Sequence, residues 1–420
     1  MGLLDRFLSK RSSRPNWVEQ DDHGYFYFNS ELSNFLGGAM KKNEVPNFDP
    51  KKSMLYASSL SEIAIPIDII ASGVSLCDFE LVDSNDEVIE NVPENLKRLI
   101  KKPNPFIHFK ELIYQIVFSE LATGGSYTLT KMPSIYKTKH FDRITNIWTL
   151  NPDNIRYKYK NEIISDPFMV KEIGDFLERY EYDFIHKNLK LKTDEVYFNS
   201  VSRLNSSLKP TPPLMKVERN INNLLQVYSA RYNVYSKNGS AGILVKEASN
   251  GNNITEQIDP TTRQDILDDL NKRDGLTGDR NFIGMSSIPL KYIETMAKIK
   301  DLEPFKETFN DAIAIAGCYN IDKELIPKEG STTYSNKEAV EIALWQNTII
   351  PMAKDVAHTL SNIYFLPEDM RFKPNFSRIQ ILQTDRETSS KADEIELNNI
   401  IKMKELGIEP PQKYKETWGI

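Results

Sequence analysis

The sequence is poor in the residues on which disulfide frameworks, metal sites and membrane spans depend. Its 420 residues include only two cysteines, Cys77 and Cys318, too few for a disulfide framework or a structural zinc site. No apolar run reaches about 18 residues, since Pro66 and Asp68 interrupt the densest stretch at 63–70, which excludes an integral membrane protein. The five histidines are scattered and include no metal-binding pair one helical turn apart: His23, His108, His140, His186 and His358.

Motifs for nucleotide hydrolysis and nucleophilic catalysis are also missing. No G-x-x-x-x-G-K-[ST] and no G-x-S-x-G occurs, so the usual P-loop ATPases and α/β-hydrolases are excluded. The segment from Asp269 begins like a calcium loop, but Arg273 and Arg280 stand where oxygen ligands belong. We therefore expect no metal, no cofactor and no catalytic residues.

The sequence also has no excess of positive charge. Lys and Arg number 53 against 59 Asp and Glu, a net charge of −6. A protein that grips DNA phosphates for affinity normally carries the opposite excess, so contact with nucleic acid should be loose. The first residues lack the apolar core of a signal peptide, and Arg6 stands where myristoylation requires Ser or Thr. These features and the few cysteines point to a reducing cytoplasm.

The first 200 residues predict a mixed α+β domain. Apolar spacing indicates helices at 58–73, 93–101 and 109–121, the last ended by Gly124 and Gly125. Alternating or β-branched runs predict strands at 77–81, 127–131, 144–150, 155–159 and 196–199.

Two long helices and a small β-α-β unit are predicted next. Thr211 and Pro212 suit a helix start, and apolar residues then recur every three or four positions to Tyr235, which predicts a helix of about 25 residues. A β-α-β pattern follows from Ile243 to Ile293, and another helix begins at Pro304. One small subunit should not bury so long an apolar stripe, so we expect neighbouring copies to cover it.

The last third predicts a kinked long helix and a terminal helix. After a polar break, Ser335 and Glu338 form a capping box that predicts a helix start. Pro351 lacks an amide proton and clashes with the carbonyl of Asn347, so the helix should kink there. A final helix is expected at 390–406.

The order of these signals resembles the HK97-like family of phage portal proteins. The matching segments are Gly2–Phe7, Pro103–Pro105, Thr123–Tyr127, Leu150–Pro152, Asn238–Leu244 and Thr332–Glu338. Each motif is weak alone, but six in the family's order over some 350 residues are specific. Two segments depart from the family pattern: Lys209–Pro213, where Gly-Ser-Pro is common, and Tyr319–Pro327, where a Val-Pro is usual.

The resemblance implies an α+β portal fold with a mixed α/β wing, a long-helix stem, a small β-α-β clip, a kinked long helix with a tunnel loop, and a helical C-terminal crown. The implied division is a flexible N-terminal segment (1–44), wing (45–210), stem helix (211–237), clip (238–300), second stem helix (301–318), tunnel loop with kinked helix (319–384) and crown (385–420).

The resemblance also implies a function and partners. Such proteins form a ring, typically of twelve subunits, at one capsid vertex; double-stranded DNA passes through it during packaging and ejection without sequence specificity. The implied partners are the terminase large subunit, a head-tail adaptor and the major capsid protein, with no membrane. The location would be the virion, and the host cytoplasm during assembly.

Particular residues follow from the same resemblance. Pro351 would set the helix kink. The DNA-facing tunnel loop would comprise Lys328, Glu329, Gly330, Ser331, Thr332, Thr333 and Tyr334. The clip that docks motor and adaptor would present Ile243, Leu244, Asp265, Asp268 and Asp269.

Two alternatives stay open on sequence alone. A phage-encoded, metal-dependent nucleic-acid enzyme could use the Asp265, Asp268 and Asp269 cluster, although a solvated helix face explains it more simply. A head-tail scaffold protein that forms no ring is the other.

Overall fold

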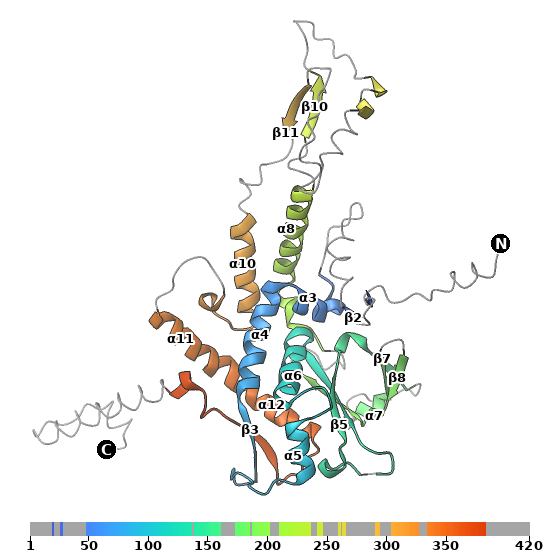
Figure 1. The fold of residues 1–420 in the computed structure, drawn as a ribbon, viewed down its shortest axis with the longest axis vertical. Helices are drawn as coiled ribbons and strands as arrows, with labels where there is room; N and C mark the ends of the chain where they lie inside the picture. Colours follow the sequence, from blue (N-terminus) through green and yellow to red (C-terminus); the bar gives the residue numbers. More distant parts are fainter. Residues whose placement is uncertain are drawn as a thin grey trace, which may run out of the picture. The chain divides into compact units, whose positions relative to one another are not determined.

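The fold is taken from a computed structural model of the 420-residue chain (Figure 1). It describes residues 19–20, 26–27, 48–136, 138–160, 173–184, 187–201, 210–236, 242–246, 259–261, 263–265, 290–294, 304–326 and 334–383. The chain divides into two compact units, one of residues 1–49 and 217–315, the other of residues 50–216 and 316–420. The predicted crown lies outside the described residues.

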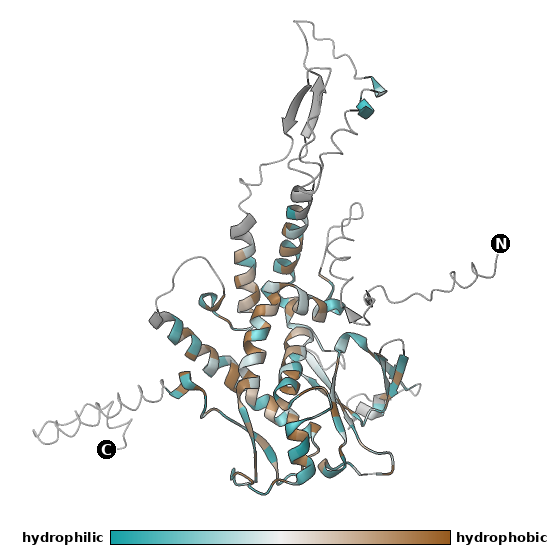
Figure 2. Ribbon diagram, viewed as in Figure 1, coloured by the Kyte–Doolittle hydropathy of each residue, from teal (hydrophilic) through white to brown (hydrophobic). Residues whose placement is uncertain are grey.

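The second unit is built on three packed helices, with brown, hydrophobic positions recurring along each of them in Figure 2. They are α4 (Ser61–Leu76), α6 (Phe109–Thr123) and α12 (Ile350–Ile363). A short 3-10 turn, η1 (Pro50–Lys52), leads into α3 (Ser53–Ser59). The sequence predicts one helix where α3 and α4 meet, but Leu60 adopts an extended conformation and the two helices meet at 82°.

The predicted end of α6 is confirmed. Gly124 caps the helix at φ +83°, the left-handed region that favours glycine. A Cβ atom there would also lie 2.2 Å from the carbonyl oxygen of Thr211. The helix predicted before it is confirmed as α5 (Glu94–Lys101).

Two three-stranded antiparallel sheets share one core in this unit. The first has the order β5-β4-β9 and the second β6-β7-β8. Their bounds are β4 (Gly125–Lys131), β5 (Asn146–Leu150), β6 (Ile155–Tyr159), β7 (Leu177–Phe184), β8 (Lys187–Leu191) and β9 (Val196–Ser200). The shared core comprises Tyr127, Leu129, Leu150, Leu177, Tyr180, Leu191 and Val196. Strands β7 and β8 were not predicted.

A separate antiparallel pair joins distant parts of the chain. Strand β3 (Asp78–Val82), which is predicted, pairs with β12 (Arg371–Asn375), which is not. The remaining short elements of this unit are η2 (Phe141–Arg143), η3 (Pro152–Asn154), α7 (Ile173–Phe176) and η7 (Lys323–Leu325).

The first unit holds the long helices and an antiparallel strand pair. A 3-10 segment η5 (Pro213–Val217) leads into α8 (Glu218–Ser236), so the predicted helix has a 3-10 first part. Strand β10 (Gly242–Lys246) pairs with β11 (Leu290–Glu294), and α10 (Pro304–Gly317) follows. Within the predicted flexible N-terminal segment, β1 (Glu19–Gln20) pairs with β2 (Phe26–Tyr27).

The predicted kinked helix consists of three parts. Helix α11 (Tyr334–Leu344) runs into a π-helical segment, η8 (Trp345–Ile349), and then into α12. Among the described residues no single helix is both long and apolar enough to cross a membrane, and only the bent pair 50–59 and 61–76 passes on length and composition.

Candidate functional site

Helices α8 and α10, the predicted stem pair, are joined by polar contacts. The Asn220 amide donates to Asp311 Oδ1 at 2.8 Å, and the Asp311 side chain is buried. One turn from the other end of α8, Arg231 Nη2 donates to Thr308 Oγ1 at 3.2 Å. The Asn220 bond gives the buried Asp311 carboxylate a donor, without which it would be costly to bury.

The expectation that neighbouring copies must cover the apolar stripe of α8 is wrong for much of its length. Ile221, Leu224 and Leu225 are fully buried within the single chain, as is Leu214 just before the helix. Tyr228 is half-buried. These four buried residues are therefore covered inside one subunit, and they give no independent argument for a ring.

The predicted clip contains a regular β ladder. Ile243 lies opposite Ile293 and Leu244 opposite Tyr292 in the β10–β11 pair. Asp265 is exposed on a helical turn that begins near Asp259. The other two carboxylates of the predicted acidic cluster, Asp268 and Asp269, lie outside the described residues. Within the described part of the chain, no group of three or more His, Cys, Asp or Glu side chains is placed to hold a metal ion.

The predicted tunnel loop, Lys328–Thr333, lies outside the described residues. Its last residue, Tyr334, is the first residue of α11. The capping box predicted a start after Ser335, so the helix begins two residues earlier than expected and Ser335 lies in its first turn.

A π-helical segment stands immediately before Pro351. In η8 the Ile350 amide donates to the Trp345 carbonyl oxygen, five residues earlier instead of four. A π turn inserts one residue into the α-helical ladder and often occurs at functional sites. The sequence predicts a kink at Pro351, but the apolar periodicity does not indicate a π-helical segment.

Gly73 of α4 permits close packing against this π segment. A Cβ atom at Gly73 would lie 2.6 Å from Ile349 Cδ1, closer than real Cβ contacts. Ile349 and Trp345 are both buried. The π segment is thus fixed by tertiary packing on one side, a role for Gly73 that sequence reasoning missed.

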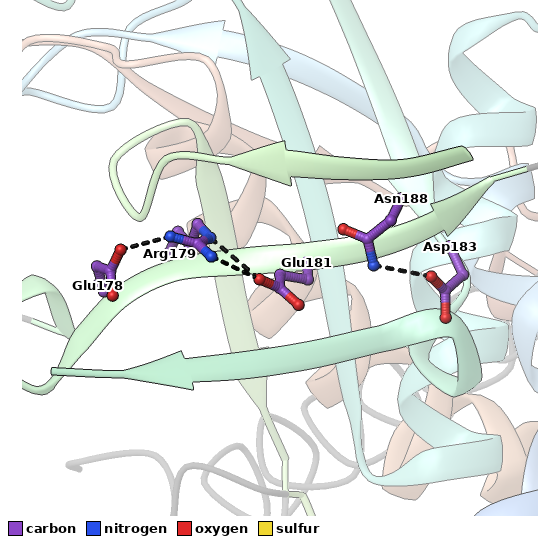
Figure 3. A network of polar contacts seen from close by, with 5 residues as sticks. All are labelled: Glu178, Arg179, Glu181, Asp183 and Asn188. Atoms are coloured by element: carbon purple, nitrogen blue, oxygen red, sulfur yellow. Dashed lines mark hydrogen bonds and ion pairs between the residues drawn. The ribbon is translucent and has the colours of Figure 1, made fainter. Parts of the chain in front are cut away.

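The outer face of the β6–β7–β8 sheet is charged, and its arginines pair with neighbouring carboxylates (Figure 3). Arg179 donates to Glu181 Oε1 at 2.9 and 3.1 Å and pairs with Glu178. Asp183 accepts from Asn188 at 2.9 Å and pairs with Arg156 at 2.7 Å. Such exposed pairs contribute little to stability, and their two arginines and three carboxylates leave one negative charge in excess.

Among the described residues of the second unit, one carboxyl group is buried. Glu120 of α6 accepts hydrogen bonds from Asn199 at 2.6 Å and Ser126 at 2.8 Å. Burial raises the pKa of Glu120 to about 7; these two hydrogen bonds oppose the rise, and the charge of Asp355 adds to it. The group ties α6 to strands β4 and β9 and faces no described cavity, so its role is structural.

Comparison with known proteins identifies the family. The family described as "Phage portal protein" matches residues 61–401 of this chain. A protein of Rickettsia bellii (strain RML369-C) described as "Uncharacterized protein" is 25% identical over 334 residues, covering 76% of this chain and 79% of the relative.

Two solved structures share the fold. A chain in the "Neck of native GTA particle computed with C12 symmetry" aligns with a TM-score of 0.55 and 14% identity over 90% of this chain and 99% of its own. A chain in the "Neck of empty GTA particle computed with C6 symmetry" gives 0.57 and 15% over 86% and 94%. GTA stands for gene transfer agent.

The resemblance inferred from the ordered motifs is thereby confirmed. The family match spans most of the chain, from the start of α4 into the segment after β12. The chain therefore belongs to the phage portal protein family, a family of structural proteins without enzymatic activity.

Proposed function

We propose that this chain forms a ring of about twelve subunits at one vertex of a tailed-phage or gene-transfer-agent capsid, through which double-stranded DNA is packaged and ejected. The observation that supports this is the family match over residues 61–401. The likeness to a chain in a neck computed with C12 symmetry supports the ring number.

The proposal assigns roles to parts of the fold. Helices α8 and α10 line the channel, and the region of β10 and β11 docks the terminase large subunit and later the head-tail adaptor. Residues 328–334 form the loop that faces DNA. Pro351 and η8 orient α11, the helix that follows this loop in the sequence. The outer surface of the second unit meets the major capsid protein. DNA passes without sequence-specific contacts, in keeping with the net charge of −6.

Mass measurement and imaging of the purified protein test the ring. Twelve copies of the 48.3 kDa chain give particles of about 580 kDa, which mass photometry should detect. Negative-stain microscopy should show a central hole in them. Monomers alone, across protein and salt concentrations and in the presence of capsid protein, would contradict the proposal.

A further inference from the structure

A group of cations on the second unit lacks the carboxylate partners found on its β6–β7–β8 sheet. It lies along α5, at the lower edge of Figure 1, and in the loop between β4 and β5. We call it the α5 cationic face; its members are Lys97, Arg98, Lys101, Lys102, Lys139 and Arg143. Within the described part of the chain, no ion pair joins any of these six to an acidic side chain.

Neutral groups hold three of these cations in place. Arg98 Nη2 donates to the carbonyl oxygens of Ile144 and Thr145 at 3.1 and 3.0 Å, which joins α5 to the loop. Arg143 Nη1 donates to a carbonyl oxygen at 2.8 Å and its guanidinium lies 5.1 Å from the ring of Tyr136.

Lys139 is held in a similar way at the other side of the face. Its ammonium lies 5.2 Å from the ring centroid of Phe365. The Tyr364 hydroxyl, next in the sequence to Phe365, donates to the Leu99 carbonyl of α5 at 3.3 Å. Carbonyl oxygens and ring faces orient a cation without cancelling its charge, so the positive potential of the face is retained.

Exposed acidic side chains near these elements, including Glu368 and Asp369 shortly after Phe365, form no ion pair with the six cations within the described part of the chain. Glu94 is exposed at the first turn of α5, and Asp142 lies 3.3 Å from His140. Lys131, at the edge of the face, is neutralised by Glu195 at 2.7 Å. In a chain of net charge −6, the face is a local excess of positive charge.

We propose that the α5 cationic face binds the phosphate backbone of duplex DNA outside the channel, without sequence specificity. This rests on the proposed function, which brings DNA into the particle. Lys97 and Lys101 are exposed one helical turn apart, and lysine ammonium groups on flexible stems can meet a row of phosphates of any sequence.

Arg98 supplies charge to the face and no specific contact. Arginine recognises carboxylate and phosphate alike best through a free, bidentate edge of its guanidinium. Arg98 has Nε and Nη2 bonded to Asn95 and Nη2 bonded to two carbonyl oxygens. Its fork is therefore occupied, and it acts as a fixed positive charge beneath the mobile lysines.

Binding to relaxed, covalently closed circular DNA tests the proposal, since a closed circle cannot thread an assembled ring. The test variant is Lys97→Ala/Lys101→Ala/Lys139→Ala. The matched control is Lys158→Ala/Lys187→Ala/Lys190→Ala, which removes three exposed lysines from the β6–β7–β8 sheet. Both are compared with the wild type after mass photometry of the assembled state.

We expect the test variant to bind the circle about tenfold more weakly at about 50 mM NaCl, with the slope of log Kd against log salt reduced by about 2.7 for three lost phosphate contacts. The control should change binding less than about twofold. Equal losses in both variants, or no loss in the test variant, would overturn the proposal. Equally tight binding of polyglutamate to the wild type would overturn it in favour of an acidic protein partner.

This result is separable from the ring itself. If the wild type forms no ring, and if circle binding is lost in the test variant but not in the control, the proposed function fails and the DNA-binding face stands. If rings form and the two variants behave alike, the ring stands and the face is refuted.

Discussion

Glu120 shows how a single side chain couples stability to pH. Its carboxyl group is almost wholly buried and its pKa is raised, because burial disfavours the charged form. The folded protein therefore holds this proton more tightly than the unfolded chain does. The resulting stability is present in full at low pH and is lost as the pH rises through about 7.

We expect Glu120→Gln to remove this pH dependence. The amide is uncharged at every pH and its oxygen can accept from Ser126 and Asn199 as the carboxyl oxygen does. Above pH 7 the variant should be more stable than the wild type by up to about 3 kcal/mol, the equivalent of the shift in pKa. Urea unfolding at several pH values between about 5 and 8 measures the difference.

Glu111→Gln is the matched control, because Glu111 is exposed on the same helix. It should leave the pH dependence of unfolding as in the wild type. If Glu120→Gln has the same slope of stability against pH as this control, the account of Glu120 is wrong.

At the scale of elements, the π segment before Pro351 sets the rotation between α11 and α12. One inserted residue turns the preceding helix by about 100° and shifts it by about 1.5 Å relative to an uninterrupted α-helix. Helix α11 begins at Tyr334, the last residue of the predicted tunnel loop, so the register of η8 determines the direction in which α11 runs from α12.

Pro351→Ala should restore a backbone donor that can reach the Asn347 carbonyl, and so favour a continuous α-helix. We expect the variant to fold with a thermal stability close to the wild type, because the Pro351 side chain is exposed. Particles assembled with it should contain less DNA. DNA content per particle and a structure of the variant ring measure the two effects.

Lys354→Ala provides the comparison, since Lys354 is exposed on the same helix and leaves the backbone donors unchanged. Normal DNA content in Pro351→Ala particles, with η8 lost, would remove the proposed role of the π segment.

Which elements the sequence predicted depends on local signals. Three such signals are Gly124 at a helix end, the apolar stripe of α6 and the alternation of β6. Each is made by residues that are close together in the sequence, and all three predictions are confirmed. Strand β12 was missed because its five residues, Arg-Phe-Lys-Pro-Asn, are polar at three positions and include a proline. It is a strand because Phe372 is buried and pairs opposite Leu81 of β3.

At the scale of the whole molecule, the two units interleave along the sequence. The second unit is made of residues 50–216 and 316–420, so the long helices and the strand pair β10–β11 form an insertion into it. The two points of insertion lie close together, because Cys318 Sγ lies 3.4 Å from the Pro213 carbonyl oxygen. A short linker can therefore span the excised part.

We expect the chain with residues 217–315 replaced by a short Gly-Ser linker to fold into the second unit. Its core of α4, α6, α12 and two sheets lies entirely in the retained residues. The shortened chain should unfold in one cooperative thermal transition but form no ring of the full size, since both stem helices are shortened or lost.

Circular dichroism during heating and mass photometry measure these outcomes. The full-length chain is the reference, and it should form the ring under the same conditions. A shortened chain without a thermal transition would show that the second unit depends on the first, contrary to the division of the fold.

By itself, the sequence determined the α+β class, the positions of most helices and the membership of the portal family. Helix caps, apolar periodicity and ordered motifs are local patterns, and they can be recognised in a single sequence. Tertiary structure alone decided that Ile221, Leu224 and Leu225 are buried within the subunit, that a π segment precedes Pro351, and that the cations of α5 and the β4–β5 loop form one face. These features depend on contacts between residues far apart in the sequence, and a periodic pattern shows which side of a helix is apolar but not what covers it.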